Sequence, residues 1–157
     1  MEIRPATADD VPGVLPMVEQ IGALHESWDR AKYGRLPNFP ERYRRWMTAQ
    51  AQNPSSVFLV AEHEGRLVGF LIGTTDREIP IYRIEQYGFI HDLWVEERYR
   101  NEGIGRQMVT LAIERFRDIG VTQVRLETAG PNEIARKLFE TCGFRTSAVS
   151  MLLEIAP

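Results

Sequence analysis

The most informative stretch of the chain is residues 89–105, FIHDLWVEERYRNEGIG, in which a nearly continuous apolar segment runs into a loop and then directly into a helix. Gly103 and Gly105 let the backbone of that loop approach a bound group closely. The first turn of the following helix leaves N–H groups without partners and carries partial positive charge. Together these features predict a cradle for an anion, and a pyrophosphate fits it. Arg100 is placed to add a charge-assisted contact.

The same loop has a plainer interpretation, a tight connection between a strand and a helix. No Lys followed by Ser or Thr comes after the glycines, so the loop is not the phosphate loop of a nucleoside triphosphatase. It is not the G-x-G-x-x-G fingerprint of dinucleotide-binding domains either. The glycines alone leave phosphate binding and a plain turn as equal alternatives.

Hydrophobic periodicity on either side of this loop predicts one α/β domain over residues 1–157, with a mixed, mostly antiparallel sheet flanked by helices. Thr7 and Asp10 resemble a capping box before a first helix, which Pro16 should kink or interrupt. The other expected helices are residues 41–51, 103–119 and 132–141. The expected strands are residues 1–5, 57–62, 67–75, 89–95 and 121–128, with a final strand or hairpin at 144–155.

Composition excludes several classes of protein. Among 157 residues, 43% are hydrophobic and 26% charged, which is ordinary for a globular domain. No apolar stretch approaches the length of a membrane span, and no signal peptide is recognisable. The net charge of −3 gives no general attraction to nucleic acid or to anionic membranes. A single cysteine, Cys142, favours a cytoplasmic location, and no residue cluster has metal-ligand spacing.

Four segments resemble the GNAT superfamily of N-acetyltransferases. Residues 100–105, RNEGIG, resemble its (Arg/Gln)-x-x-Gly-x-(Gly/Ala) motif, and residues 90–95 resemble the central strand that precedes it. Asn132, Ala135 and residues 138–144, LFETCGF, resemble its late signature, and residues 3–7 resemble its first strand. The resemblance covers nearly the whole chain and is weakest across residues 25–52.

The resemblance implies a GNAT-type fold, acetyl-CoA as the acyl donor without a metal, and a set of roles. The backbone of Leu93, Trp94 and Val95 would bind the pantetheine arm as an added strand, and the Leu93 N–H would stabilise the oxyanion. Asn132 would hold the same arm, and Phe139 would lie near the thioester sulfur. The pyrophosphate would contact Arg100 and the loop and helix residues Asn101, Glu102, Gly103, Ile104, Gly105 and Arg106.

Two catalytic roles are open. Many relatives have a tyrosine at the position of Phe139 to protonate the departing thiolate. Here water protonates the thiolate, another residue such as Cys142 or a tyrosine of residues 25–52 does so, or only binding remains. For the base we predict His91, since strand alternation places it on the same sheet face as Leu93 and Val95. The alternative is a histidine that is hydrogen-bonded within the sheet. Glu85 and Asp92 are further candidates, with Asp92 expected on the opposite face.

We therefore expect acetyl transfer from acetyl-CoA to a primary amine of a small molecule or peptide. Two alternatives are a catalytically silent CoA-binding sensor or assembly module and a nucleotide-binding domain. The acceptor would be bound by a polar and aromatic segment that either recognises a cationic amine or packs as core: His25, Trp28, Asp29, Tyr33, Tyr43 and Trp46. A homodimer involving the apolar strand expected at residues 149–155 is a further prediction.

Overall fold

The computed structural model describes all residues from Met1 to Pro157. Its sheet has the strand order β1-β2-β3-β4-β5, in which the first four strands are antiparallel and β5 runs parallel to β4. The strands are β1 Glu2–Pro5, β2 Val57–His63, β3 Arg66–Arg77, β4 Gln86–Val95 and β5 Val124–Leu126. The helices are α1 Val11–Trp28, α2 Arg30–Tyr33, α3 Phe39–Ala51, α4 Ile104–Ile119 and α5 Glu133–Thr141.

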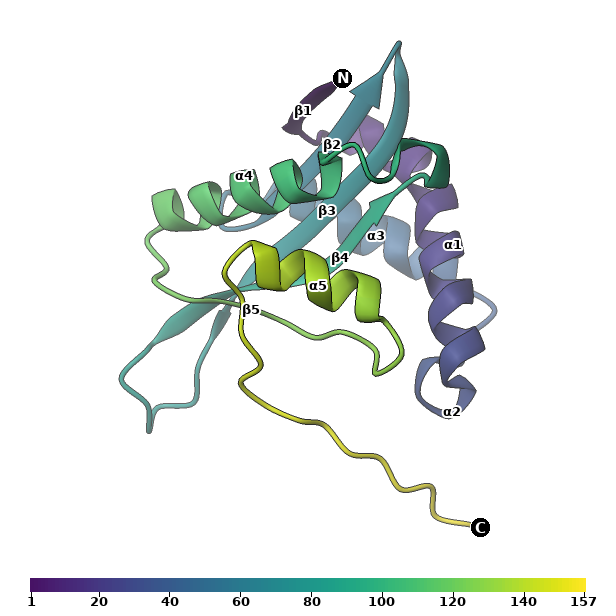
Figure 1. Ribbon diagram of the computed structural model, residues 1–157, viewed down its shortest axis with the longest axis vertical. Coiled ribbons are helices and arrows are strands. Elements are labelled where there is room, and N and C mark those ends of the chain that lie inside the picture. Colours follow the sequence, from purple (N-terminus) through teal and green to yellow (C-terminus); the bar gives the residue numbers. More distant parts are fainter.

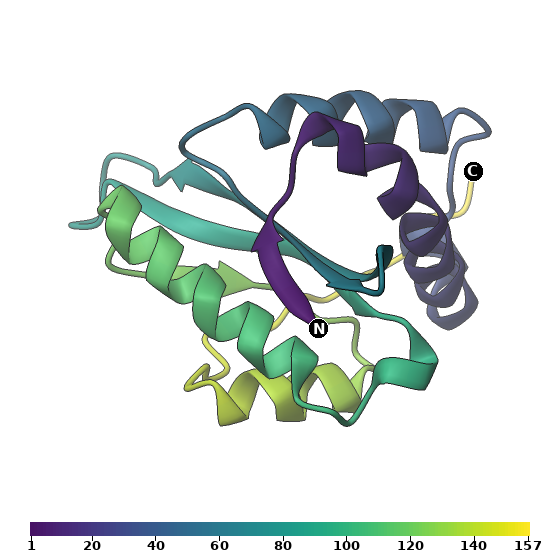
Figure 2. The ribbon, with the colours of Figure 1, turned by 90° about the horizontal axis from the view of Figure 1, so that it is seen from above.

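Helices cover both faces of this sheet (Figures 1 and 2). α4 and α5 lie on one face, where the core is built around Phe116, Met108 and Leu71. α1 and α3 lie on the other face, where Met17, Met47 and Phe70 are completely buried. The predicted class, a mixed, mostly antiparallel sheet flanked by helices, is confirmed.

Pro16 does not interrupt the first helix, although interruption was one of the two outcomes expected of it. α1 runs without a break from Val11 to Trp28. A proline near the helix start removes only one backbone hydrogen bond, and the buried side chains of Val14, Met17 and Val18 hold the helix on the sheet. The capping box is present, since the Asp10 carboxylate accepts the Thr7 N–H at 2.7 Å.

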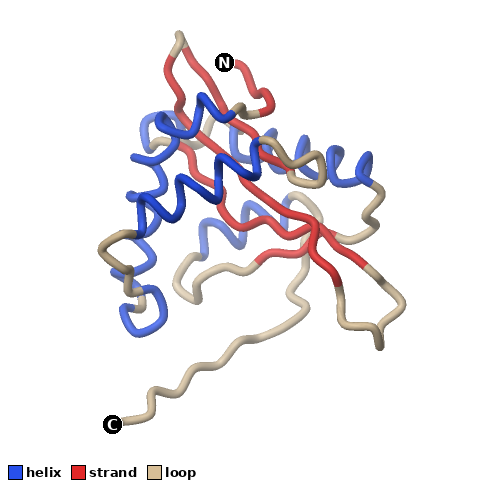
Figure 3. The backbone as a smooth tube through the Cα atoms, turned by 180° about the vertical axis from the view of Figure 1, so that it is seen from behind, coloured by secondary structure: helices blue, strands red, loops and turns tan.

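The C-terminal prediction was wrong. Residues 144–155 were expected to form a strand or hairpin, but no residue after Thr141 belongs to a helix or strand. The chain instead extends away from the sheet, as Figures 1 and 3 show. β5 is also shorter than predicted, since only Val124–Leu126 of the expected residues 121–128 pair with β4. Alternating side chains form a strand only when they pair with a neighbouring strand, and residues 144–155 pair with none.

Candidate active site

A β-bulge in β4 determines where the catalytic candidates lie. Ile72 pairs with Asp92 and the next residue, Gly73, pairs with Ile90, so His91 is an extra residue on β4. Ile90 and Leu93 both face the α4/α5 side, whereas His91 and Asp92 both face the α1/α3 side. The prediction that His91 shares the face of Leu93 and Val95 was therefore wrong, because it assumed unbroken alternation.

His91 is the end of a short hydrogen-bonded chain. The Thr74 hydroxyl donates to Asp76 Oδ1 at 2.9 Å, and its oxygen lies 2.7 Å from His91 Nε2. A hydroxyl has one hydrogen, so Nε2 must carry the proton that it shares with Thr74. The lone pair of the neutral ring is then on Nδ1, the atom that can accept a proton from another molecule.

The surroundings of His91 keep it neutral near physiological pH. Its ring contacts Trp46 and Phe89, with centroids 5.1 and 4.9 Å away, although the side chain stays accessible to solvent. Loss of hydration against these rings lowers the pKa of His91 below 6.5, and the charges of Asp92 and Asp76 only partly oppose that shift. A neutral imidazole is the form that acts as a base.

Asp92, the next residue, is engaged inside the protein. The Tyr43 hydroxyl of α3 donates a hydrogen bond to Asp92 Oδ2. Burial raises the pKa of the Asp92 carboxyl, while the bond from Tyr43 opposes this shift. The same carboxylate partly offsets the lowering of the His25 pKa by burial. This carboxyl anchors α3 to the sheet, and that role makes it a weaker candidate base than His91.

Of the residues predicted for the acceptor side, Tyr43 and Trp46 contact Asp92 and His91. Trp28, Asp29 and Tyr33 instead line a cavity that Phe139 also lines. The His25 ring stacks on Tyr33 at 5.0 Å and lies 5.6 Å from Trp28. A hollow of about 410 Å³ between α2 and α3 is lined by Tyr33, Phe39, Tyr43 and Trp46 together with Lys32, Arg35 and Arg42. Its charged residues are all cationic, whereas acidic residues had been expected beside the aromatic ones. Asp29 instead caps α2 by accepting the Lys32 N–H at 3.1 Å.

The glycine loop has unused hydrogen-bond donors. None of the N–H groups from Asn101 through Arg106 donates to a backbone carbonyl. Asn101 and Gly103 adopt left-handed φ angles of 64° and 81°, and α4 begins at Ile104. Consecutive donors at a left-handed turn and a helix start form an anion-binding concavity.

Arg100 is already engaged within the protein. Its Nε donates to the Val95 carbonyl at 2.8 Å, and its guanidinium lies 4.6 Å from the centre of the Trp94 ring. This side chain therefore holds the loop on the end of β4. The Trp94 ring belongs to the α1/α3 face, and its indole N–H is buried without an acceptor.

β4 and β5 pair over only three residues of β4, Gly88 to Ile90. Beyond Ile90 the edge of β4 that faces β5 has no strand partner, so no strand pairs with Leu93, Trp94 and Val95 on that side. The Val95 carbonyl is nevertheless engaged, since it accepts the bond from Arg100 Nε. A Cβ on Gly105 would lie 3.2 Å from Leu138 Cδ2 and 4.0 Å from side-chain atoms of Leu93 and Val95. The helix that starts at the glycine loop thus packs directly against the open part of β4.

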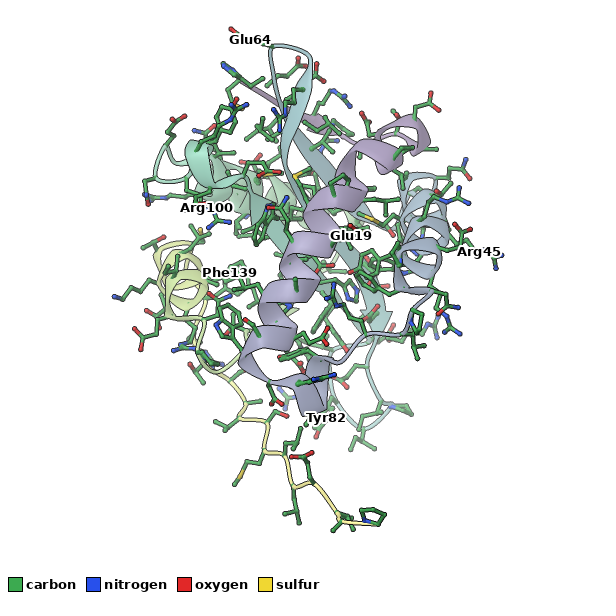
Figure 4. The ribbon with its side chains drawn as sticks, turned by 90° about the vertical axis from the view of Figure 1, so that its right-hand side faces the viewer. Glu19, Arg45, Glu64, Tyr82, Arg100 and Phe139 are labelled. Carbon is green, nitrogen blue, oxygen red and sulfur yellow. The ribbon has the colours of Figure 1, made fainter.

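The two late residues have different environments. Asn132 caps α5, with its Oδ1 accepting the Ala135 N–H at 3.1 Å, and its amide NH₂ remains free to donate. Phe139 is buried, packs edge-on against Phe144 and lines a cavity of about 960 Å³ beside the end of β5. Figure 4 shows Phe139 and Arg100 on the same side of α1, opposite Arg45.

The structure thus brings together most of the predicted residues, in two groups separated by β4. Sequence reasoning missed Thr74 and Asp76, which reach His91 only through the pairing of β3 with β4. The signal for them was weak, a polar Thr-Thr-Asp run after an apolar strand. No group of three or more His, Cys, Asp and Glu side chains is arranged to hold a metal ion. None of the helices combines the length and apolar character needed to cross a membrane.

Comparison with known proteins gives a consistent result. Residues 21–144 match the model of the Acetyltransferase (GNAT) family. An uncharacterised N-acetyltransferase of Bacillus subtilis, YhfO, is 26% identical over 92% of this chain and 89% of its own length. A mycothiol acetyltransferase of Sanguibacter keddieii is 27% identical over 89% of this chain. The chain spans about half of that relative's length, 46%.

Solved structures share the fold. A protein from Bacillus halodurans superposes with a TM-score of 0.84 at 23% identity, covering 99% of this chain and 100% of its own. A predicted acetyltransferase from Clostridium acetobutylicum, solved with acetyl-CoA, gives a TM-score of 0.78 at 16% identity, covering 98% of this chain and 95% of its own. At such identities these likenesses concern the fold alone.

Proposed function

Because the chain belongs to the GNAT family of acetyltransferases, we propose that it transfers the acetyl group of acetyl-CoA directly to a primary amine of a small molecule or peptide. The observation that carries this proposal is the run of unpaired N–H donors from Asn101 to Arg106, next to the open edge of β4. The glycine loop offers donors to a pyrophosphate, and the open edge of β4 offers main-chain groups to an extended amide-bearing arm.

The binding roles follow from these positions. The pyrophosphate accepts hydrogen bonds from the loop and the first turn of α4, while Arg100 stabilises the loop from behind. The main chain of Leu93, Trp94 and Val95 pairs with the pantetheine arm, and the free amide of Asn132 is the donor proposed for its other side. The Leu93 N–H stabilises negative charge on the thioester oxygen during attack. Phe139 contributes an apolar surface near the sulfur.

His91 is the proposed general base. An amine acceptor is mostly protonated at neutral pH, so it must lose a proton before its nitrogen can attack. Nδ1 of neutral His91 takes that proton, and Thr74 with Asp76 holds the ring in the required tautomer. The new C–N bond forms as the C–S bond breaks, and the electron pair of that bond leaves on the thiolate. The nitrogen, positively charged after the attack, releases its excess proton to water to give the neutral amide. His91 takes its proton on the α1/α3 face, so the acceptor approaches from that side.

Protonation of the thiolate does not use the position that serves many relatives, because Phe139 has no proton to donate. We propose that water protonates it, since a thiolate is a good leaving group. Cys142, at the C-terminal end of α5, is partly buried and is the protein alternative. The catalytically silent CoA-binding module remains the alternative function, and the missing tyrosine is the observation that favours it.

Two measurements test the proposal. Acetyl-CoA and CoA should raise the melting temperature, whereas ATP should not, since a ligand that binds only the folded state stabilises it. A panel of polyamines, amino acids, aminoglycosides and peptides, assayed by release of free thiol, should then identify an acceptor. Absence of any CoA-induced shift would contradict the binding site. A shift without turnover on any amine would favour the silent module.

A further inference from the structure

The hollow between α2 and α3 combines aromatic walls with positive charge. Its volume of about 410 Å³ falls within the range of small-molecule pockets, about 300–1,000 Å³. Lys32, Arg35 and Arg42 are the charged residues that line it, and no acidic side chain does so. We call it the cationic hollow. Charge of one sign around a hollow favours a ligand that carries the opposite charge.

Two of these three cations have no partner within the protein. Arg35 Nε donates to Glu26 Oε2 at 2.8 Å, so its charge is already balanced. Neither Lys32 nor Arg42 forms an ion pair with an acidic side chain. Lys32 also lines the cavity that Phe139 lines, so the hollow adjoins the proposed position of the thioester.

The arginines of α3 show that the unpaired charge is confined to the hollow. Arg44 and Arg45 lie outside it, and both contact Glu41, at 2.7 and 3.6 Å. Arg42 lines the hollow and is the one of the three without such a contact. The guanidinium of Arg42 is therefore available to an anion from another molecule, and a guanidinium binds carboxylates and phosphates well.

The cationic hollow is connected to the proposed base through its aromatic walls. The Trp46 ring lines the hollow and its centre lies 5.1 Å from that of the His91 ring. Tyr43 also lines the hollow, and its hydroxyl donates to Asp92. A small molecule held in the hollow thus extends along apolar rings toward His91.

The charge reverses along this path. At the His91 end the ionisable neighbours are acidic: Asp92 is adjacent in β4, and Asp76 is joined to His91 through the Thr74 hydroxyl. At the other end Lys32 and Arg42 are cationic. An ammonium group is favoured at the first end and an anion at the second.

We propose that the acceptor is a zwitterionic amine, in which the amine and a carboxylate or phosphate lie at opposite ends of an apolar body. Lys32 and Arg42 bind the anion, the aromatic walls contact the body, and the amine reaches His91. This inference rests on the proposed acetyl transfer and narrows its acceptor. Polyamines and aminoglycosides carry several positive charges, so the same cations disfavour them.

A series of benzylamines tests the charge preference, because its members share the amine and the ring. The para substituent is hydrogen, carboxylate, phosphate or aminomethyl, and kcat/KM is measured at saturating acetyl-CoA. We expect an anionic member to exceed benzylamine about tenfold, the value of one charge-assisted hydrogen bond, and the dicationic member to be poorest. Comparison of the carboxylate with the phosphate identifies the preferred anion.

Paired variants assign this preference to the hollow. The double substitution Lys32→Gln, Arg42→Gln should bring the ratio of the anionic to the unsubstituted amine close to one. The control Arg44→Gln, Arg45→Gln also removes two positive charges, but from outside the hollow, and Figure 4 shows Arg45 pointing away from the fold. This control should keep the full ratio. All four residues are exposed, so circular dichroism should show folded protein in both variants.

Calorimetric titration of 4-(aminomethyl)benzoate into the CoA-bound protein gives a second measurement that needs no turnover. Its Kd should rise about tenfold in Lys32→Gln, Arg42→Gln and stay unchanged in the control. Equal kcat/KM across the series, or a ratio that survives the double substitution, would overturn the inference and leave acetyl transfer intact. If no amine were acetylated, acetyl transfer itself would fail, and equal binding of benzylamine and its carboxylate would refute the anion site as well.

Discussion

The two faces of β4 differ in how their chemistry is built. On the α4/α5 face, the proposed donor site consists mainly of backbone: the N–H groups of Asn101 through Arg106 and the open edge beyond Ile90. On the α1/α3 face, the proposed proton-transfer site consists of side chains from separate strands and helices, joined at His91 and Asp92. Backbone sites depend on a local conformation, whereas side-chain sites depend on tertiary pairing. The two faces should therefore respond differently to substitution.

The largest effect is expected in the glycine loop. Gly103 has a φ of 81°, so Gly103→Val forces a β-branched residue into a left-handed conformation. The free N–H groups should lose their arrangement, and most of the CoA-induced rise in melting temperature should disappear. At a CoA concentration 100 times the Kd, the stabilisation at risk is about 2.7 kcal/mol.

Gly130→Ala is the matched control for the loop, because a Cβ at Gly130 meets no atom within 4 Å. It should keep the full CoA-induced shift. If Gly103→Val kept the shift as well, the pyrophosphate would bind elsewhere and the proposed backbone site would be wrong.

The next largest effect should come from His91→Ala, which changes the other face. Loss of a general base typically lowers the rate about 10²–10⁴-fold, so kcat/KM should fall by that order while CoA binding is unchanged. In the wild type, the lowered pKa of His91 places the acid limb of the pH profile below 6.5, with activity lost as the pH falls through that limb. His63→Ala, at the end of β2, is the control. Full activity with an unaltered profile in His91→Ala would exclude His91 as the base.

The two faces were not equally predictable from the sequence. Gly103 could be interpreted because residue type and left-handed backbone conformation are linked at such a position, and the helix follows immediately. The face of His91 could not be predicted, because a one-residue bulge leaves no mark in an apolar segment and reverses the alternation at once. Thr74 and Asp76 lie in another strand, so only the register of β3 with β4 brings them to the site. The alternating pattern of residues 149–155 predicts a strand, but whether a strand forms depends on pairing that the pattern does not encode.

A smaller effect is expected from Thr74→Val, which breaks the connection between His91 and Asp76 but leaves both in place. Thr74 is a positioning residue, so we expect kcat to decrease by less than the roughly 10²–10⁴-fold cost of losing the base itself, with KM for acetyl-CoA unchanged. Thr74→Ser keeps the hydroxyl and should restore the rate. Asp76→Asn removes a charge that raises the His91 pKa. The acid limb of the pH–rate profile of this variant should therefore lie at lower pH than that of the wild type. An unmoved limb and a normal rate in Thr74→Val would show that the tautomer is not set by this chain.

The smallest effect concerns the Asp92 carboxyl and appears in stability. Burial raises the folded-state pKa of Asp92 above its ordinary value, so its contribution to stability is greatest at low pH and is lost as the pH rises through that folded-state pKa. Asp92→Asn removes the titrating charge, and its amide oxygen can still accept the bond from Tyr43. The melting temperature of the variant relative to wild type should therefore increase as the pH rises from 3.8, the ordinary pKa of the carboxyl, through the raised folded-state pKa. A change of about 1 kcal/mol corresponds to about 2–4 °C for a chain of this size. Tyr43→Phe removes the bond that favours the charged carboxylate, so its deficit relative to wild type should instead grow with pH. A constant difference across this range in both variants would mean that Asp92 is already fully ionised or fully neutral throughout, and that burial on the α1/α3 face does not control it.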